Sequence, residues 1–132
     1  MIPRFRAWDV ELKSMKEVMD IDYRLECVEV SDSDGDTYIQ GFSNIKLMQS
    51  TGLTDKNGKE IFEGDVLKIT DKHSWLEVVS FNEKKAMFVS KEIHRNTDIP
   101  ESPLWDLFIT NLFKLEVIGN RYENKELLEV QT

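Results

Sequence analysis

The feature that most constrains the fold is a series of short runs in which apolar and polar residues alternate, separated by turns. Alternation with a period of two places one set of side chains on one face of an extended strand, so these runs predict half-buried β-strands. Asp34-Gly35 and Asn57-Gly58 each stand between two such runs, and glycine supplies the positive φ that tight hairpin turns require. The second turn suits either a primed turn or a type I turn closed by a glycine bulge. The expected strands cover residues 4–8, 25–30, 37–42, 45–50, 61–69 with a break at Gly64, 76–81, 86–89 and 115–119.

Three segments leave this pattern. Residues 11–19 fit either one helical face or a turn at residues 9–13 followed by a strand, and we favour the hairpin. Ser102-Pro103 has the form of an N-cap followed by proline at the first helical position, which predicts a short helix over residues 103–108. Asn124 predicts the cap of a last short helix over residues 125–130.

Closely spaced strands, many turns and one or two short helices predict a mainly β, β-rich α+β protein built of antiparallel hairpins. The order of elements from residue 61 to residue 119 resembles a small SH3-like barrel, an analogy that indicates no function. No linker, repeat or low-complexity segment divides the chain, so we expect a single domain over residues 1–132. Within it, residues 1–45 form the N-terminal hairpins and residues 46–132 the barrel-like part with the C-terminal helix.

Charge and cysteine content restrict the class of protein. The chain has 25 acidic and 17 basic residues, a formal net charge of −8. This charge opposes sequence-independent binding of nucleic acid, which depends on lysine and arginine displacing counterions from phosphates. The single cysteine, Cys27, excludes an intramolecular disulfide and is typical of a reducing compartment. Because the sequence also lacks a long apolar run and the pattern of a secretory signal, we expect a cytoplasmic protein with no membrane partner.

The acidic residues are concentrated between Asp20 and Asp36, where Arg24 is the one base among seven acids. The ordinary interpretation of such a run is a solvated face that aids solubility, and the alternative is a patch that engages a basic partner. The members of this candidate interaction patch are Asp20, Asp22, Glu26, Glu29, Asp32, Asp34 and Asp36.

Several motifs for binding and catalysis fail on spacing. A phosphate-binding loop over residues 52–60 has its glycines one residue too far apart, and a calcium loop starting at Asp32 lacks its glycine and its bidentate glutamate. Residues 41–45 lack the last glycine of a nucleophile elbow. His73 and His94 lie outside any paired-ligand spacing, and one cysteine makes no zinc set. We therefore expect no cofactor and no metal site.

Two groups of residues leave alternatives open. Acid/base catalysis needs carboxylates whose environments separate their pKa values, and solvated turns are the default interpretation of the cluster Asp55, Glu60, Glu63 and Asp65. Aromatic side chains on an exposed barrel face would stack on nucleic-acid bases, whereas packing in the core is the favoured interpretation of Trp75, Phe81 and Phe88.

Three stretches together resemble the YopX family, small proteins of phages and prophages in Gram-positive bacteria. They are Phe5-Arg6-Ala7-Trp8-Asp9, the twenty residues 47–66, and residues 116–124 followed by two leucines. The resemblance implies a phage-encoded cytoplasmic protein of mostly β structure, and it brings no established activity and no catalytic residues. In the central stretch we expect a structural role in turns for Gly52, Asp55, Asn57, Gly58, Gly64 and Asp65.

These observations favour a non-enzymatic interaction or regulatory module that binds an unknown host or phage protein. The alternative is a nucleic-acid-associated regulator that uses the face of a small β-barrel, and an enzyme comes third because no catalytic constellation is found. Self-association into a homo-oligomer is a further expectation, since a β-rich chain presents exposed strand edges.

Overall fold

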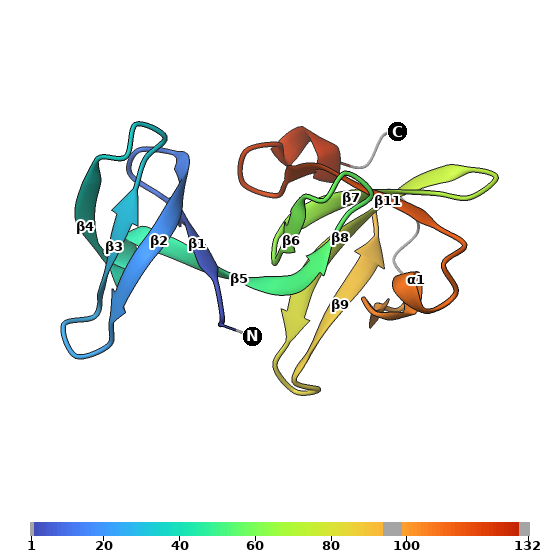
Figure 1. Cartoon of the computed structure of the whole chain (residues 1–132), viewed down its shortest axis with the longest axis horizontal. Helices are drawn as coiled ribbons and strands as arrows, with labels where there is room; N and C mark the ends of the chain where they lie inside the picture. Colours follow the sequence, from blue (N-terminus) through green and yellow to red (C-terminus); the bar gives the residue numbers. More distant parts are fainter. Residues whose placement is uncertain (1, 94–98, 130–132) are drawn as a thin grey trace. The chain divides into compact units, whose positions relative to one another are not determined.

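A computed structural model describes residues 2–93 and 99–129 of the chain. It divides into two compact units, residues 1–50 and residues 51–132 (Figure 1). Strand β5 (Ile45–Thr54) is the element in which the chain passes from the first unit to the second. No helix among the described residues is long and apolar enough to cross a membrane.

The first unit is an antiparallel sheet. Its strands are β1 (Phe5–Asp9), β2 (Ser14–Asp22), β3 (Cys27–Ser31), β4 (Thr37–Gly41) and the first part of β5, in the order β4-β3-β2-β1-β5. A 3-10 turn, η1 (Phe42–Asn44), joins the last two strands. Residues 10–22 form a turn and a strand, which confirms the hairpin over the helix. The Asp9 carboxylate accepts the Leu12 N–H at 2.8 Å, and Lys13 takes a positive φ of 53° to enter β2.

The core of the first unit lies on one face of this sheet. It consists of the buried residues Ala7, Val28, Val30 and Ile45, with Val18 and Ile21 of β2 packed against them. These two residues are three apart, although side chains on one face of a regular strand are two or four apart. A register shift between Val18 and Asp20 in the β2–β3 pairing supplies the extra residue, so a β-bulge brings both side chains to the core.

The second unit contains the end of β5, β6 (Glu60–Phe62) and a five-stranded antiparallel sheet. The strands of that sheet are β7 (Asp65–Thr70), β8 (Ser74–Asn82), β9 (Met87–Glu92), β10 (Ser102–Pro103) and β11 (Lys114–Asn120), in the order β10-β9-β8-β7-β11. The buried residues Ile61, Leu67, Ile69, Val79, Leu104 and Leu115 form its core.

The mainly β fold is confirmed, but this sheet does not close into a barrel. Among the described strands, β10 pairs only with β9 and β11 only with β7. Strand β10 is two residues long, and Pro103 has no N–H to donate to a further strand, so the ladder ends there.

The two predicted helices are shorter than expected, and the first begins at a different residue. Ser102 and Pro103 do not open a helix, because they form β10, and the Leu104 N–H continues the pairing by donating to the Phe88 carbonyl at 3.0 Å. Leu104 is then buried in the core, and α1 (Asp106–Ile109) starts only after it. At the other end, η2 (Lys125–Leu128) is a 3-10 helix that the Asn124 side chain does not cap. The predicted helix ran on to residue 130, which lies outside the described residues.

Candidate functional site

The residues of the acidic run are spread over two turns and the strands between them. Asp22 ends β2 and Glu26 lies in the β2–β3 turn, whereas Asp32, Asp34 and Asp36 lie in the β3–β4 turn, at the opposite end of β3. The five residues of β3 separate the two turns by about 17 Å. Between the turns, Asp20 and Glu29 are direct cross-strand partners.

Part of the acidic run shapes the backbone. The Asp22 carboxylate accepts the Leu25 N–H at 2.9 Å, and the Asp32 carboxylate accepts the N–H groups of Asp34 and Asp36 at 3.0 and 3.1 Å. Asp and Asn side chains commonly stabilise turns in this way. Turn formation therefore accounts for two members of the run without reference to a partner.

Asp55 links the β5–β6 turn to a distant strand. Its Oδ1 accepts the N–H groups of Asn57 and Lys59, both at 2.9 Å, and its Oδ2 accepts the Val117 N–H of β11 at 2.9 Å. Burial by itself raises the pKa of Asp55, but these N–H groups, with that of Val117 the strongest, outweigh it and hold the pKa below its usual value. An ionised, fully engaged carboxylate of this kind is a structural group.

The glycines predicted to shape turns have left-handed backbones. Gly58 has φ = 78°, and its N–H donates to the Asp55 carbonyl while Asn57 keeps a negative φ, so the turn is type I with a glycine bulge. Gly52 and Gly64 have φ of 80° and 89°. The Asp65 carboxylate is buried and accepts the Phe62 N–H at 2.8 Å across the Gly64 turn.

The other candidate residues are dispersed. His73 is exposed on the β7–β8 turn, Cys27 is half-buried on β3, and His94 lies outside the described residues. In the part of the chain that the structure describes, no three His, Cys, Asp or Glu side chains are placed to hold a metal ion. Trp75 and Phe88 pack against the core of the second unit, whereas Phe81 is 37% exposed and contacts Phe88 edge-on.

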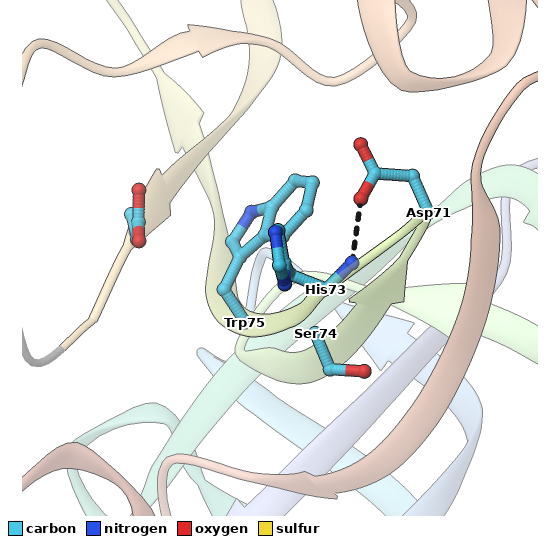
Figure 2. A pocket seen from close by; sticks show the side chains of 5 residues that line it. Asp71, His73, Ser74 and Trp75 are labelled. Atoms are coloured by element: carbon cyan, nitrogen blue, oxygen red, sulfur yellow. Dashed lines mark hydrogen bonds between the residues drawn. The ribbon is translucent and has the colours of Figure 1, made fainter.

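A hollow of about 330 Å³ lies beside the β7–β8 turn, and we call it the Trp75 hollow. Figure 2 shows the turn that forms it, with the Asp71 carboxylate directed at the backbone nitrogen of His73 and the Ser74 hydroxyl pointing to the opposite side. The described residues that line it are Asp71, His73, Ser74, Trp75 and Glu92. No lysine or arginine is among these described residues.

The indole of Trp75 is held from two directions. Its Nε1–H donates to Glu77 Oε2 at 2.7 Å, and its ring meets Phe113 edge-on with centroids 5.8 Å apart. The other oxygen of Glu77 accepts the Ser90 hydroxyl at 2.7 Å. Glu77 and Glu92 are register partners on β8 and β9, so two carboxylates stand on the same face of the sheet beside the indole.

Two side chains of the β7–β8 turn form hydrogen bonds that stabilise the turn. Asp71 accepts the His73 N–H at 2.9 Å, and this hydrogen bond is the main reason that the pKa of Asp71 lies below its usual value. The Ser74 hydroxyl shares a hydrogen bond of 3.1 Å with Thr70 rather than with His73. A nucleophile activated by a base is therefore not assembled here, whereas an aromatic wall among carboxylates suits the binding of a cation.

The comparisons with known proteins agree with this architecture. The YopX protein family model matches residues 4–129. The chain belongs to the YopX family. Protein EF1440 from Enterococcus faecalis is 30% identical, with 98% of this chain and 99% of that chain covered and a TM-score of 0.62. Protein yopX from Bacillus subtilis is 22% identical, with 98% of each chain covered and a TM-score of 0.55, a likeness of fold. No curated protein matches the chain.

In this YopX-family chain the three stretches that carry the resemblance lie against one another. The first, in β1, pairs with the start of the second in β5. The second contacts the third through Asp55 and Val117, through Asp65 and Asn120 as register partners, and through the Arg121 N–H, which donates to the Gly64 carbonyl at 2.9 Å. The stretches that carry the resemblance therefore take part in strand pairing and in the turns of the fold.

The sequence did not predict the Trp75 hollow, because strand pairing brings together residues that are far apart along the chain. The segment from Asp71 to Trp75 carries a usable signal, an aspartate at the start of a short turn followed by a histidine and a tryptophan. Glu77 and Glu92 are fifteen residues apart, and only the β8–β9 pairing makes them neighbours.

Proposed function

We propose that the protein is a non-enzymatic interaction module whose Trp75 hollow binds a basic side chain, preferentially arginine, of a partner protein. The observation that carries the proposal is the pair of facing carboxylates, Glu77 and Glu92, beside the indole of Trp75. Membership of the YopX family, together with the phage or prophage origin that the resemblance implies, supports a host or phage protein in the bacterial cytoplasm as the partner.

The electrostatic argument begins with the facing carboxylates. Glu92 lines the hollow and is half-buried, and its register partner Glu77 is half-buried beside the indole. Asp71 adds a third carboxylate at the edge of the hollow. A cationic group that enters the hollow is attracted by the carboxylates of Glu92 and Asp71 that line it.

The Trp75 indole supplies the surface on which such a cation rests. Its hydrogen bond to Glu77 and its edge-on contact with Phe113 fix the ring before binding, so little conformational freedom is lost on association. Tryptophan is the strongest aromatic partner for a cation, and a planar guanidinium both stacks on the ring and bonds to carboxylates in pairs. This geometry favours arginine over lysine.

The absence of an assembled nucleophile among the lining residues supports a binding role. The Ser74 hydroxyl is bonded to Thr70, and both oxygens of Glu77 are bonded to Trp75 and Ser90. These groups orient the hollow rather than present a reactive atom to a substrate.

The experiment is a titration of the ¹⁵N-labelled full chain, followed by NMR at the indole N–H of Trp75. That signal is assigned with Trp75→Phe, because the chain has three tryptophans. The ligand is a blocked pentapeptide with one arginine among glycines, and its control carries citrulline, which has the same shape and no charge. We expect saturable shifts with a Kd of about 1 mM for the arginine peptide and none for the citrulline peptide.

The variants Asp71→Asn and Glu92→Gln, combined, remove two charges, and the asparagine side chain keeps an oxygen that can accept the N–H of the turn. We expect them to weaken arginine binding about three- to tenfold, and Glu83→Gln on the exposed β8–β9 turn to leave it unchanged. Equal binding of arginine and citrulline peptides would overturn the proposal. Shifts at Trp75 caused by single-stranded DNA, without shifts from the arginine peptide, would favour the nucleic-acid alternative instead.

A further inference from the structure

A second hollow, of about 460 Å³, lies on the other side of the same β7–β8 turn, and we call it the Leu112 hollow. It is formed by the turn together with the connection from α1 to β11. The residues that line it are Thr70, Asp71, Lys72, Leu112, Phe113 and Lys114. Only Asp71 is shared with the Trp75 hollow.

The apolar part of this hollow follows from the way α1 ends. Asn111 takes a positive φ of 56°, a conformation that asparagine tolerates, and its N–H donates to the Phe108 carbonyl at 3.3 Å. The chain changes direction at Asn111, so the side chains of Leu112 and Phe113 lie in different surroundings. Phe113 packs against Trp75, while Leu112 remains 72% exposed.

Two further exposed apolar side chains belong to the helical turn that precedes Leu112. Trp105, which directly precedes α1, and Ile109, its last residue, are 57% and 59% exposed. Trp105 and Ile109 are four positions apart, the spacing that places side chains along one side of a helical turn, and Leu112 follows the turn at Asn111. Exposed large apolar side chains that occur together, rather than singly, are typical of interaction surfaces.

The charge of the Leu112 hollow is opposite to that of the Trp75 hollow. Lys72 and Lys114 contribute two ammonium groups in a chain with a net charge of −8, and neither forms an ion pair with a described residue. The one acid, Asp71, is already bonded to the His73 N–H. An anionic group beside an apolar one is therefore the complementary ligand.

We propose that the Leu112 hollow binds an acidic, apolar segment of a partner protein, with a large apolar side chain against Leu112 and Phe113 and flanking carboxylates at Lys72 and Lys114. The two hollows thus select side chains of opposite charge on either side of one turn. This second site does not depend on the first, because its ligand contacts are made by different side chains.

The test is a titration of the ¹⁵N-labelled full chain with a blocked hexapeptide that carries Leu-Phe between two aspartates. Two further peptides carry asparagines or lysines in place of the aspartates. We expect the aspartate peptide to bind most tightly, with shifts concentrated at residues 70–72 and 112–114. Lys114→Glu, on the exposed side of β11, should weaken it about three- to fivefold and improve binding of the lysine peptide.

Lys84→Glu makes the same charge change on the exposed β8–β9 turn and should alter neither affinity. Leu112→Ser should reduce binding of all three peptides, and because Leu112 is exposed the variant should keep the wild-type melting temperature. Equal affinities for the aspartate and asparagine peptides would overturn the proposal. So would shifts that fall outside the two segments, or an equal effect of Lys84→Glu and Lys114→Glu.

Discussion

At the scale of single residues, two buried carboxylates determine much of the local structure. Asp9 in the first unit accepts the Leu12 N–H, the Tyr38 hydroxyl at 2.7 Å and the Gln40 amide at 3.1 Å. Asp55 in the second unit accepts three backbone N–H groups. Each stands at the end of a strand, closes the turn that follows and reaches a segment far away in the sequence.

Replacement of Asp55 by asparagine tests this role. The remaining oxygen can still accept the two N–H groups of the turn, but the new amide NH₂ faces the Val117 N–H, and two donors are left without an acceptor. We expect Asp55→Asn to lower the free energy of unfolding by about 1–3 kcal/mol in urea denaturation. Asp34→Asn, on the exposed β3–β4 turn, is the control and should change it little. A fully stable Asp55→Asn protein would show that the link to β11 is dispensable.

Gly64 has a backbone conformation that residues with a side chain rarely adopt. It is buried and has φ = 89°. Its N–H donates a hydrogen bond to the Val79 carbonyl, and its carbonyl accepts one from the Arg121 N–H. We expect Gly64→Val to lower stability by about 1–3 kcal/mol, measured by thermal unfolding. The matched control is Gly41→Val, because Gly41 has φ = −69° and an added Cβ would meet nothing closer than 3.9 Å. Equal melting temperatures for the two variants would contradict the conformational explanation.

At the scale of elements, one turn design recurs in three hairpins. Asp9, Asp22 and Asn82 each accept the N–H three residues on, and the residue four positions on has a positive φ. Those residues are Lys13, Glu26 and Ala86, with φ of 53°, 53° and 52°. A residue other than glycine or asparagine lowers the stability of the folded state when it adopts this conformation.

This design predicts a stabilising substitution. Ala86→Gly removes the steric cost of the positive φ, and we expect a gain of about 0.5–1 kcal/mol in the free energy of unfolding. Lys84→Gly, in the same turn but without a positive φ, should lower stability because glycine only adds disorder to the unfolded chain. A loss of stability in Ala86→Gly comparable to that in Lys84→Gly would refute the prediction.

The strands and turns were predictable because their signals are local, whereas contacts between distant elements were not. Asp34-Gly35 and Asn57-Gly58 marked their hairpins correctly. The helix expected at Pro103 failed because Leu104 enters the core and Ser102 pairs with β9, and neither contact is visible in the local pattern. The Trp75 hollow depends in the same way on the pairing of Glu77 with Glu92.

At the scale of the whole molecule, the chain builds two cores, and each unit contains a buried carboxylate whose pKa is lowered by hydrogen bonds. Burial raises the pKa of Asp9, but the Leu12 N–H, Tyr38 and Gln40 outweigh burial, so the pKa lies below the ordinary value of 3.8, as it does for Asp55. Burial and the same bond to Asp9 raise the pKa of Tyr38. Self-association through exposed strand edges stays a prediction.

The lowered pKa values set the direction of the pH dependence. A carboxylate that ionises more readily in the folded state stabilises the protein fully above its unfolded pKa, and this contribution is lost as the pH falls through the folded value. We expect the free energy of unfolding to drop between about pH 5 and about pH 2. The double variant Asp9→Asn with Asp55→Asn, although less stable at neutral pH, should show a smaller drop. An unchanged pH dependence in the double variant would mean that other carboxylates dominate.

The central claim is that this YopX-family chain binds a cationic side chain through the Trp75 hollow. The most direct measurement is the shift of the Trp75 indole N–H on addition of the arginine peptide, compared between the wild type and the combined Asp71→Asn and Glu92→Gln variant. The account predicts a saturable shift in the wild type and an affinity about three- to tenfold lower in the variant. A wild-type signal that does not move, or that moves equally in the variant, would contradict it.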